Sequence, residues 1–131
     1  MVIDRRILDD LSERAKSSPR LRMAYDLRNT EEENSQRMLN AIEPGTVVPI
    51  HRHWGSNEIV LCIRGHFIEI LYNADGSIAE EIDMVPGGNI VNVPIGQWHN
   101  LRSLESGTVM MEAKHGKYEP VKEENILRTQ R

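Results

Sequence analysis

The sequence predicts a single all-β domain, a small barrel or sandwich, with one helix packed outside it. Its 131 residues suit one domain and leave no room for two. From Gly45 onward, short runs rich in Ile, Val and Leu alternate with turn residues, a spacing typical of all-β folds. We therefore divide residues 1–131 into an N-terminal helix at 1–19, a barrel at 36–115 and a polar tail at 116–131.

The N-terminal helix is predicted over residues 4–17. Asp4 is a suitable N-cap, and Ser17-Ser18-Pro19 ends the run. The apolar side chains that share one helical face are Ile7, Leu8, Leu11 and Ala15. This face is the one that would pack against the barrel.

Residues 20–43 are predicted as a strand, an acidic loop and a second strand at 36–43. Met23, Tyr25 and Leu27 alternate with polar residues, as in a half-buried strand. The alternative is a helix, because Thr30 and Glu33 have the spacing of a capping box.

The remaining strands are predicted from apolar runs between turn residues. These runs cover 46–53, 57–64, 66–73, 77–85, 89–93, 98–104 and 108–114. The breaks between them contain Gly65, Asp75-Gly76, Pro86-Gly87-Gly88, Pro94-Ile95-Gly96 and Ser106-Gly107. In the polar tail, residues 121–128 are predicted as a short helix.

Composition excludes several classes of function. The 20 acidic and 16 basic residues give a net charge of −4, and no dense basic run marks a nucleic-acid or membrane surface. Cys62 is the only cysteine, so no internal disulfide can form and a reducing compartment is expected. The charged N-terminus does not resemble a signal peptide, and the longest apolar run, 59–63, is too short to span a membrane. We expect a cytoplasmic protein.

Histidine is the informative residue type. His51 and His53 are two residues apart in a predicted strand, so both rings should lie on one face. Glu58 begins the next predicted strand, and His99 begins another. Three imidazoles and one carboxylate suit Fe(II), Mn(II), Ni(II), Zn(II) or Co(II). Any one of these histidines taken alone is more simply a surface or hydrogen-bonded core residue.

The spacing of these residues resembles the two cupin motifs. The first motif is Gly45-x5-His51-x-His53-x4-Glu58-x6-Gly65. The second is Gly88-x5-Pro94-x-Gly96-x2-His99, with Ser103 where an asparagine is often found. The resemblance implies a double-stranded β-helix, or jelly roll, with one divalent metal ion held by His51, His53, Glu58 and His99.

A narrower resemblance is to WbuC-type cupin-fold metalloproteins. It is carried by the helix, residues 36–46, His51-Arg52-His53 and residues 112–120. It implies a setting in bacterial surface-polysaccharide biosynthesis without implying a reaction. We expect an enzyme acting on a sugar or nucleotide sugar, as isomerase, epimerase or oxygenase. The alternative is a non-catalytic module that binds a small carbohydrate or an anion through the metal.

Five further residues are candidates for contact with the ligand. Some metal-free cupins use a His and a Tyr for sugar chemistry, which makes His115 and Tyr118 catalytic candidates. Trp54, Arg52 and Arg64 are candidates for substrate binding, by stacking or by holding an anion. The plainer interpretation is that the tryptophan covers a barrel edge and the arginines are solvated.

Strand alternation also predicts a homodimer. If Glu58 points inward, Cys62 does too, as a buried structural thiol, and Ile59, Leu61 and Ile63 point outward. Such a row is costly to leave in water, and Ile68 and Ile70 would extend it if the next strand pairs with this one. The alternative is that the helix covers the row. Glu69 is either a partner of the metal site or exposed.

Overall fold

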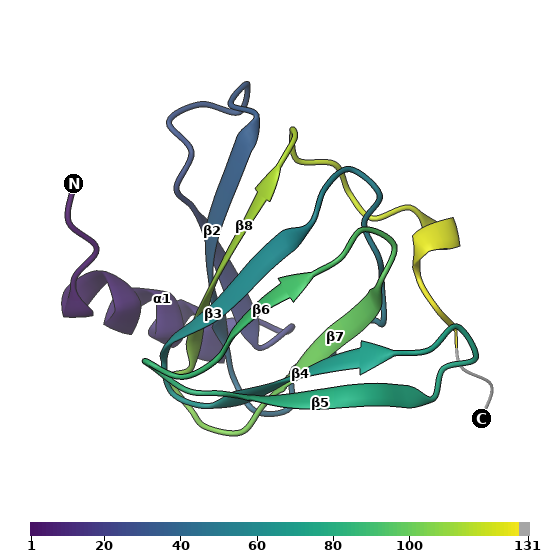
Figure 1. The fold of residues 1–131 in the computed structure, drawn as a ribbon. Helices are drawn as coiled ribbons and strands as arrows, with labels where there is room; N and C mark the ends of the chain where they lie inside the picture. Colours follow the sequence, from purple (N-terminus) through teal and green to yellow (C-terminus); the bar gives the residue numbers. More distant parts are fainter. Residues whose placement is uncertain (129–131) are drawn as a thin grey trace.

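The computed structural model describes residues 1–128 and contains two antiparallel sheets (Figure 1). The larger has the order β1-β2-β8-β3-β6, and the smaller has the order β5-β4-β7. The strands are β1 (Arg22–Asp26), β2 (Ser35–Ile42), β3 (Glu58–Arg64), β4 (Phe67–Tyr72), β5 (Ile78–Met84), β6 (Ile90–Val93), β7 (Trp98–Ser103) and β8 (Val109–His115). The predicted all-β architecture is confirmed.

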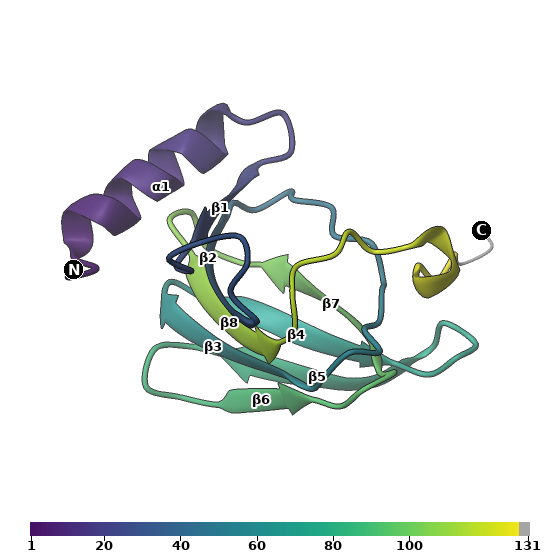
Figure 2. The same ribbon diagram turned by 90° about the horizontal axis from the view of Figure 1, so that it is seen from above.

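The predicted helix is α1 (Arg5–Ser17), and it lies outside the sheets beside β1 and β2 (Figure 2). The Asp4 carboxylate caps it by accepting hydrogen bonds from the amides of Arg6 and Ile7. Leu11 and Ala15 are buried in a cluster with residues of β2 and β8. No helix within residues 1–128 is long and apolar enough to cross a membrane.

The segment between α1 and the barrel forms strand, loop and strand, as predicted. No helix begins at Thr30. Instead, the Glu33 carboxylate accepts a hydrogen bond from the Asn29 amide and pairs with Arg37, which closes the loop between β1 and β2. The capping-box alternative is therefore wrong, because Glu33 bonds to a residue before Thr30 and to the following strand.

Two predictions of regular structure are wrong. Residues 46–53 do not form a strand; only His51 makes bridges, to His99 and Ile126. Pro49 within this run has no amide hydrogen to donate to a sheet. The helix predicted at 121–128 is reduced to one 3-10 turn at Glu123–Asn125.

Strands β3 and β4 belong to different sheets, although one short turn joins them. β3 pairs with β6 and β8, whereas β4 pairs with β5 and β7. The turn contains Gly65, with φ +85°, and a Cβ atom there would lie 2.6 Å from the Cα atom of Thr108. The expected side-by-side row of outward residues from β3 and β4 therefore does not form.

The core lies between the two sheets and follows the predicted alternation of β3. Glu58, Val60 and Cys62 are buried, whereas Ile59 is 38% exposed. Burial raises the pKa of the Cys62 thiol to about 11, which fits an unreactive structural cysteine. On the outer face, Leu61 is half-buried, and half-buried Ile63 packs against the cluster under α1. The helix thus covers one end of the predicted apolar row.

Candidate metal centre

His51, His53 and His99 lie together at one end of the barrel. His51 and His99 form a two-way backbone bridge, with N–O distances of 3.0 and 2.9 Å. The His53 carbonyl accepts a hydrogen bond from the Gly96 amide in the turn before β7. One nitrogen from each ring lies within 4.8 Å of the others, so the three histidines can hold a metal ion. The second cupin motif therefore brings His99 to the first.

Backbone carbonyls orient two of the rings. His51 Nδ1 lies 2.8 Å from the Pro49 carbonyl oxygen, and His99 Nδ1 lies 2.9 Å from that of Gln97. A carbonyl oxygen can only accept, so each Nδ1 carries the hydrogen and each Nε2 keeps a free lone pair. Metal-binding histidines are commonly held this way.

Glu58 supplies a carboxylate oxygen beside two of these rings. Its Oε2 lies 3.3 Å from His53 Nε2 and 3.8 Å from His99 Nε2. Both Glu58 Oε2 and His99 Nε2 are buried, and neither has a hydrogen-bond partner within residues 1–128. Because unpaired buried polar atoms are costly, a cation between them would remove the penalty. The donor set therefore fits a divalent metal ion.

Burial keeps the three imidazoles neutral. It is the largest cause that lowers the pKa of His51, His53 and His99 to about 4. The neighbouring rings lower the pKa of His51 further, and the Lys114 ammonium does so for His53. Neutral imidazole is the form that binds metal, so the site needs no proton release from histidine at pH 7.

Two further carboxyl groups, Glu69 and Glu112, line one cavity with His51, Glu58 and His99. Glu69 is 1% exposed, its Oε2 has no partner among the described residues, and burial raises its pKa well above the usual range. Burial, followed by the charge of Glu58, raises the pKa of Glu112 to about 7. The sequence left the role of Glu69 undecided and did not indicate Glu112 as a site residue. Glu112 reaches the cavity because it pairs opposite Val60 in the β3–β8 register, which the sequence does not show.

The cavity that contains this centre has a volume of about 530 Å³. The candidate Tyr118 lines it, with 57% of its surface exposed. Apart from the histidines, glutamates and Tyr118, the polar residues of its wall are Ser18, Arg20, Arg22, Asn40 and Asn100. The centre is thus open to a small molecule.

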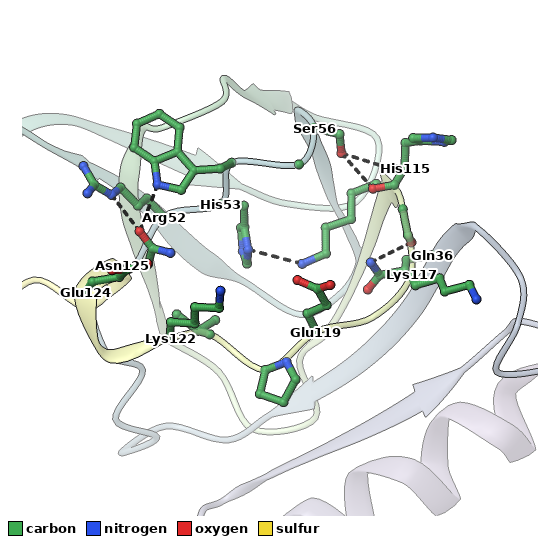
Figure 3. Close-up of a pocket in the computed structure, with 16 residues that line it drawn as sticks. Gln36, Arg52, His53, Ser56, His115, Lys117, Glu119, Lys122, Glu124 and Asn125 are labelled. Atoms are coloured by element: carbon green, nitrogen blue, oxygen red, sulfur yellow. Dashed lines mark hydrogen bonds between the residues drawn. The ribbon is translucent and has the colours of Figure 1, made fainter.

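The other candidate residues lie elsewhere. Arg52 stacks between the rings of Trp54 and Trp98, at 4.6 and 4.2 Å, and Arg52 and Trp54 both donate to the Asn125 side chain. Arg52, Trp54 and Asn125, with His115, border a second cavity (Figure 3), in which the His115 ring points away from His53.

Arg64 lines neither cavity. It donates hydrogen bonds to Asp9 and Ser12 of α1 and to the Gly107 carbonyl. The structure therefore places Arg64 at the junction with the helix, and not with the other substrate-binding candidates.

Two facing antiparallel sheets with a histidine cluster between them define a protein of the cupin fold. Solved structures agree. KdgF from Halomonas sp. is 17% identical, with a TM-score of 0.63 over 77% of this chain and 84% of that one. A cupin-2 domain protein from Shewanella frigidimarina is 16% identical, with a TM-score of 0.55 over 71% and 79%. At such identities the likeness establishes the fold.

Residues 3–84 match the family described as "Domain of unknown function (DUF6016)", and the chain belongs to that family. No curated protein matches it. The capsular polysaccharide assembling protein CapF from Staphylococcus aureus is 21% identical, with a TM-score of 0.63 over 74% of this chain. The matched region spans only 29% of CapF. The narrower resemblance to WbuC-type proteins stays a prediction.

Proposed function

We propose that this protein is a metal-dependent enzyme acting on a sugar or nucleotide sugar in bacterial surface-polysaccharide biosynthesis. In this proposal, His51, His53, Glu58 and His99 hold one divalent ion, of Fe, Mn, Ni, Zn or Co. The observation that carries it is the unpaired, buried Glu58 Oε2 atom, which lies within 3.8 Å of two imidazole Nε2 atoms. The similarity in fold to CapF, a capsular polysaccharide assembling protein, supports this setting.

The residues of the cavity suit isomerase, epimerase or oxygenase chemistry. A bound divalent ion would act as a Lewis acid on a sugar carbonyl or hydroxyl. Glu112, with a pKa of about 7, can give or take a proton near neutral pH, and burial raises the pKa of Glu69 well above its usual range. Asn40 donates to Glu112 at 3.3 Å and orients it. Tyr118 borders the same space, and its hydroxyl is a candidate contact for the sugar.

The competing function is a non-catalytic module that holds a carbohydrate or an anion at the metal. Pure binding gives no reason to keep two proton-carrying carboxyl groups beside the ligand, because each costs stability. Glu69 and Glu112 therefore favour the enzyme.

The test begins with metal analysis of protein purified without a histidine tag. We expect about one divalent ion per chain, and a sharp loss in His51→Ala, His53→Ala or His99→Ala. Glu58→Gln keeps the shape but removes the anion, so it should weaken binding less. His66→Ala is the matched control, because His66 pairs with Asp83 in the turn before β4.

A nucleotide-sugar screen follows, by thermal shift and product analysis with and without metal. Full metal occupancy in the three alanine variants would refute the ligand set. Binding without turnover across the screen would favour the non-catalytic module.

We also propose a homodimer built on the outer face of β3 and β6. Ile59 is 38% exposed there, and Ile90, which pairs with half-buried Leu61, is 67% exposed. This apolar strip is the part of the predicted row that α1 leaves uncovered.

A further inference from the structure

A second cavity, of about 330 Å³, lies at the mouth of the barrel beside the metal centre (Figure 3). Its walls are the 52–56 loop, the end of β8 and the segment 116–125. His53 lines this cavity, whereas His51, Glu58 and His99 line the first. Because His53 belongs to the same histidine cluster as His51 and His99, the two cavities adjoin at the metal centre.

The lining of this second cavity is positive, although the chain is negative. Its basic residues are Arg52, Lys114, Lys117 and Lys122. Its acidic residues are Glu119 and Glu124, so the lining carries +2 on a chain of net charge −4. A concave wall of one sign concentrates ions of the other sign.

Two of these lysines have no carboxylate partner among residues 1–128. Lys114 stands opposite Glu58 in the β3–β8 register, and its Nζ atom has one contact, His53 Nδ1, at 3.5 Å. The Lys122 side chain makes no ion pair or hydrogen bond within the described chain, and it turns toward the cavity below His53 (Figure 3). By contrast, Lys117 points away and pairs with Glu32 at 3.2 Å.

The neighbours of Lys114 explain why no negative charge balances its ammonium group. An imidazole ring carries no negative charge, so His53 cannot balance the Lys114 ammonium group. Glu112, two residues earlier on β8, bonds instead with Asn40 and lines the other cavity. A half-buried ammonium beside a neutral ring is a binding point for an anion.

We propose that this cavity is a second ligand site, which binds the phosphoryl or carboxylate group of an anionic sugar between Lys114 and Lys122. The volume leaves space for a sugar ring beside the anionic group. That the ligand is a sugar rests on the proposed function, whereas anion binding here does not. Glu119 faces the same space (Figure 3) and weakens the site by repulsion.

Both tryptophans of the chain report on this cavity, because Trp54 lines it and Trp98 packs on the same Arg52 side chain. We would therefore follow tryptophan fluorescence during titration with inorganic phosphate, glucose 6-phosphate, glucuronate and glucose. Phosphate and at least one anionic sugar should bind, and neutral glucose should not. A response to glucose 6-phosphate alone identifies a phosphoryl ligand, and one to glucuronate alone identifies a carboxylate.

Two variants should move anion affinity in opposite directions. Lys122→Met should weaken it at least about fivefold, and Glu119→Gln should tighten it several-fold, since each changes one charge facing the anion. Lys16→Met is the matched control, because Lys16 pairs with Glu13 on the exposed side of α1. Circular dichroism and a melting curve would establish that each variant is folded.

The titrations are made on protein freed of metal by a chelator and desalted, and again after reloading with Zn²⁺. Anion binding to the metal-free protein that falls in Lys122→Met supports this site, even if the metal proposal fails. No anion binding, or equal losses in Lys122→Met and Lys16→Met, would overturn it. Binding that needs metal and survives in Lys122→Met would place the anion on the metal and would also overturn it.

Discussion

Metal binding should withstand acid far better than ordinary imidazole chemistry allows. Histidine has an unperturbed pKa of 6.5, which alone predicts that protons displace the metal below that pH. In the folded protein, burial lowers the pKa of all three histidines to about 4. Proton competition should therefore begin about two pH units lower.

The size of the difference makes this a sharp test. At pH 5.5, three independent groups of pKa 6.5 would weaken metal binding about 1,300-fold, or about 4 kcal/mol. Three groups of pKa about 4 would weaken it by only about 10%. Glu112 has a pKa of about 7, so at pH 5.5 it carries a proton. If metal binding expels this proton, the competition weakens metal affinity by a further factor of about 30 at pH 5.5.

The assay is competition for Zn²⁺ against a chelator of known proton dependence, at pH 7.5, 6.5 and 5.5. Wild type and Glu112→Gln are compared, because the variant removes the one-proton contribution. We expect at most a one-proton slope in wild type and a nearly flat profile in Glu112→Gln. A thousandfold loss in both proteins would mean that the imidazoles titrate normally, which would refute the argument from burial.

Three other predictions follow from particular residues. Gly65→Ala should destabilise the protein by about 3 kcal/mol or more in urea unfolding, because φ is +85° and a Cβ atom would strike Thr108. The control is Gly107→Ala, which has the same φ but open space around it and should cost only about 1 kcal/mol. Equal losses of stability in the two variants would contradict the clash with Thr108. Because burial raises the pKa of Glu69 in the folded state, the stability of the metal-free protein should fall as pH rises above the unfolded pKa of about 4.3. Glu69→Gln should lose less stability than wild type between pH 5 and 8. An equal fall of melting temperature with pH in the two proteins would count against this. Light scattering should find a dimer that Ile59→Glu dissociates, and a monomeric wild type at tens of micromolar would end that proposal.

The sequence alone predicted most of the strands and the placing of His51 beside His53, because both depend on local patterns. The alternation that buries Glu58 and Cys62 and leaves Ile59 outside is a property of one strand, visible in seven residues. His51 and His53 needed only their spacing. His99 came from the second motif, a resemblance that carries long-range information which periodicity does not.

The rest depends on register between strands that are distant in sequence. Glu112 faces the cavity because it stands opposite Val60, and Lys114 because it stands opposite Glu58. Nothing local distinguishes these residues from the surface charges of β5. The run 46–53 looked like a strand because its composition is apolar, but tertiary contacts place only His51 beside another strand.

The barrel interior is divided by charge, and this division is what the fold contributes to function. Deep between the sheets, an apolar cluster around Phe67 and Val60 satisfies every local rule of a stable core. Toward the mouth, buried polar atoms of Glu58, Glu69 and His99 have no partner within residues 1–128. Replacing them by apolar groups would extend the core and add stability, so their presence has to be explained by a ligand. A divalent cation would supply the partner that the Glu58 carboxylate and the His99 lone pair lack, and this places the chemistry where the apolar packing ends.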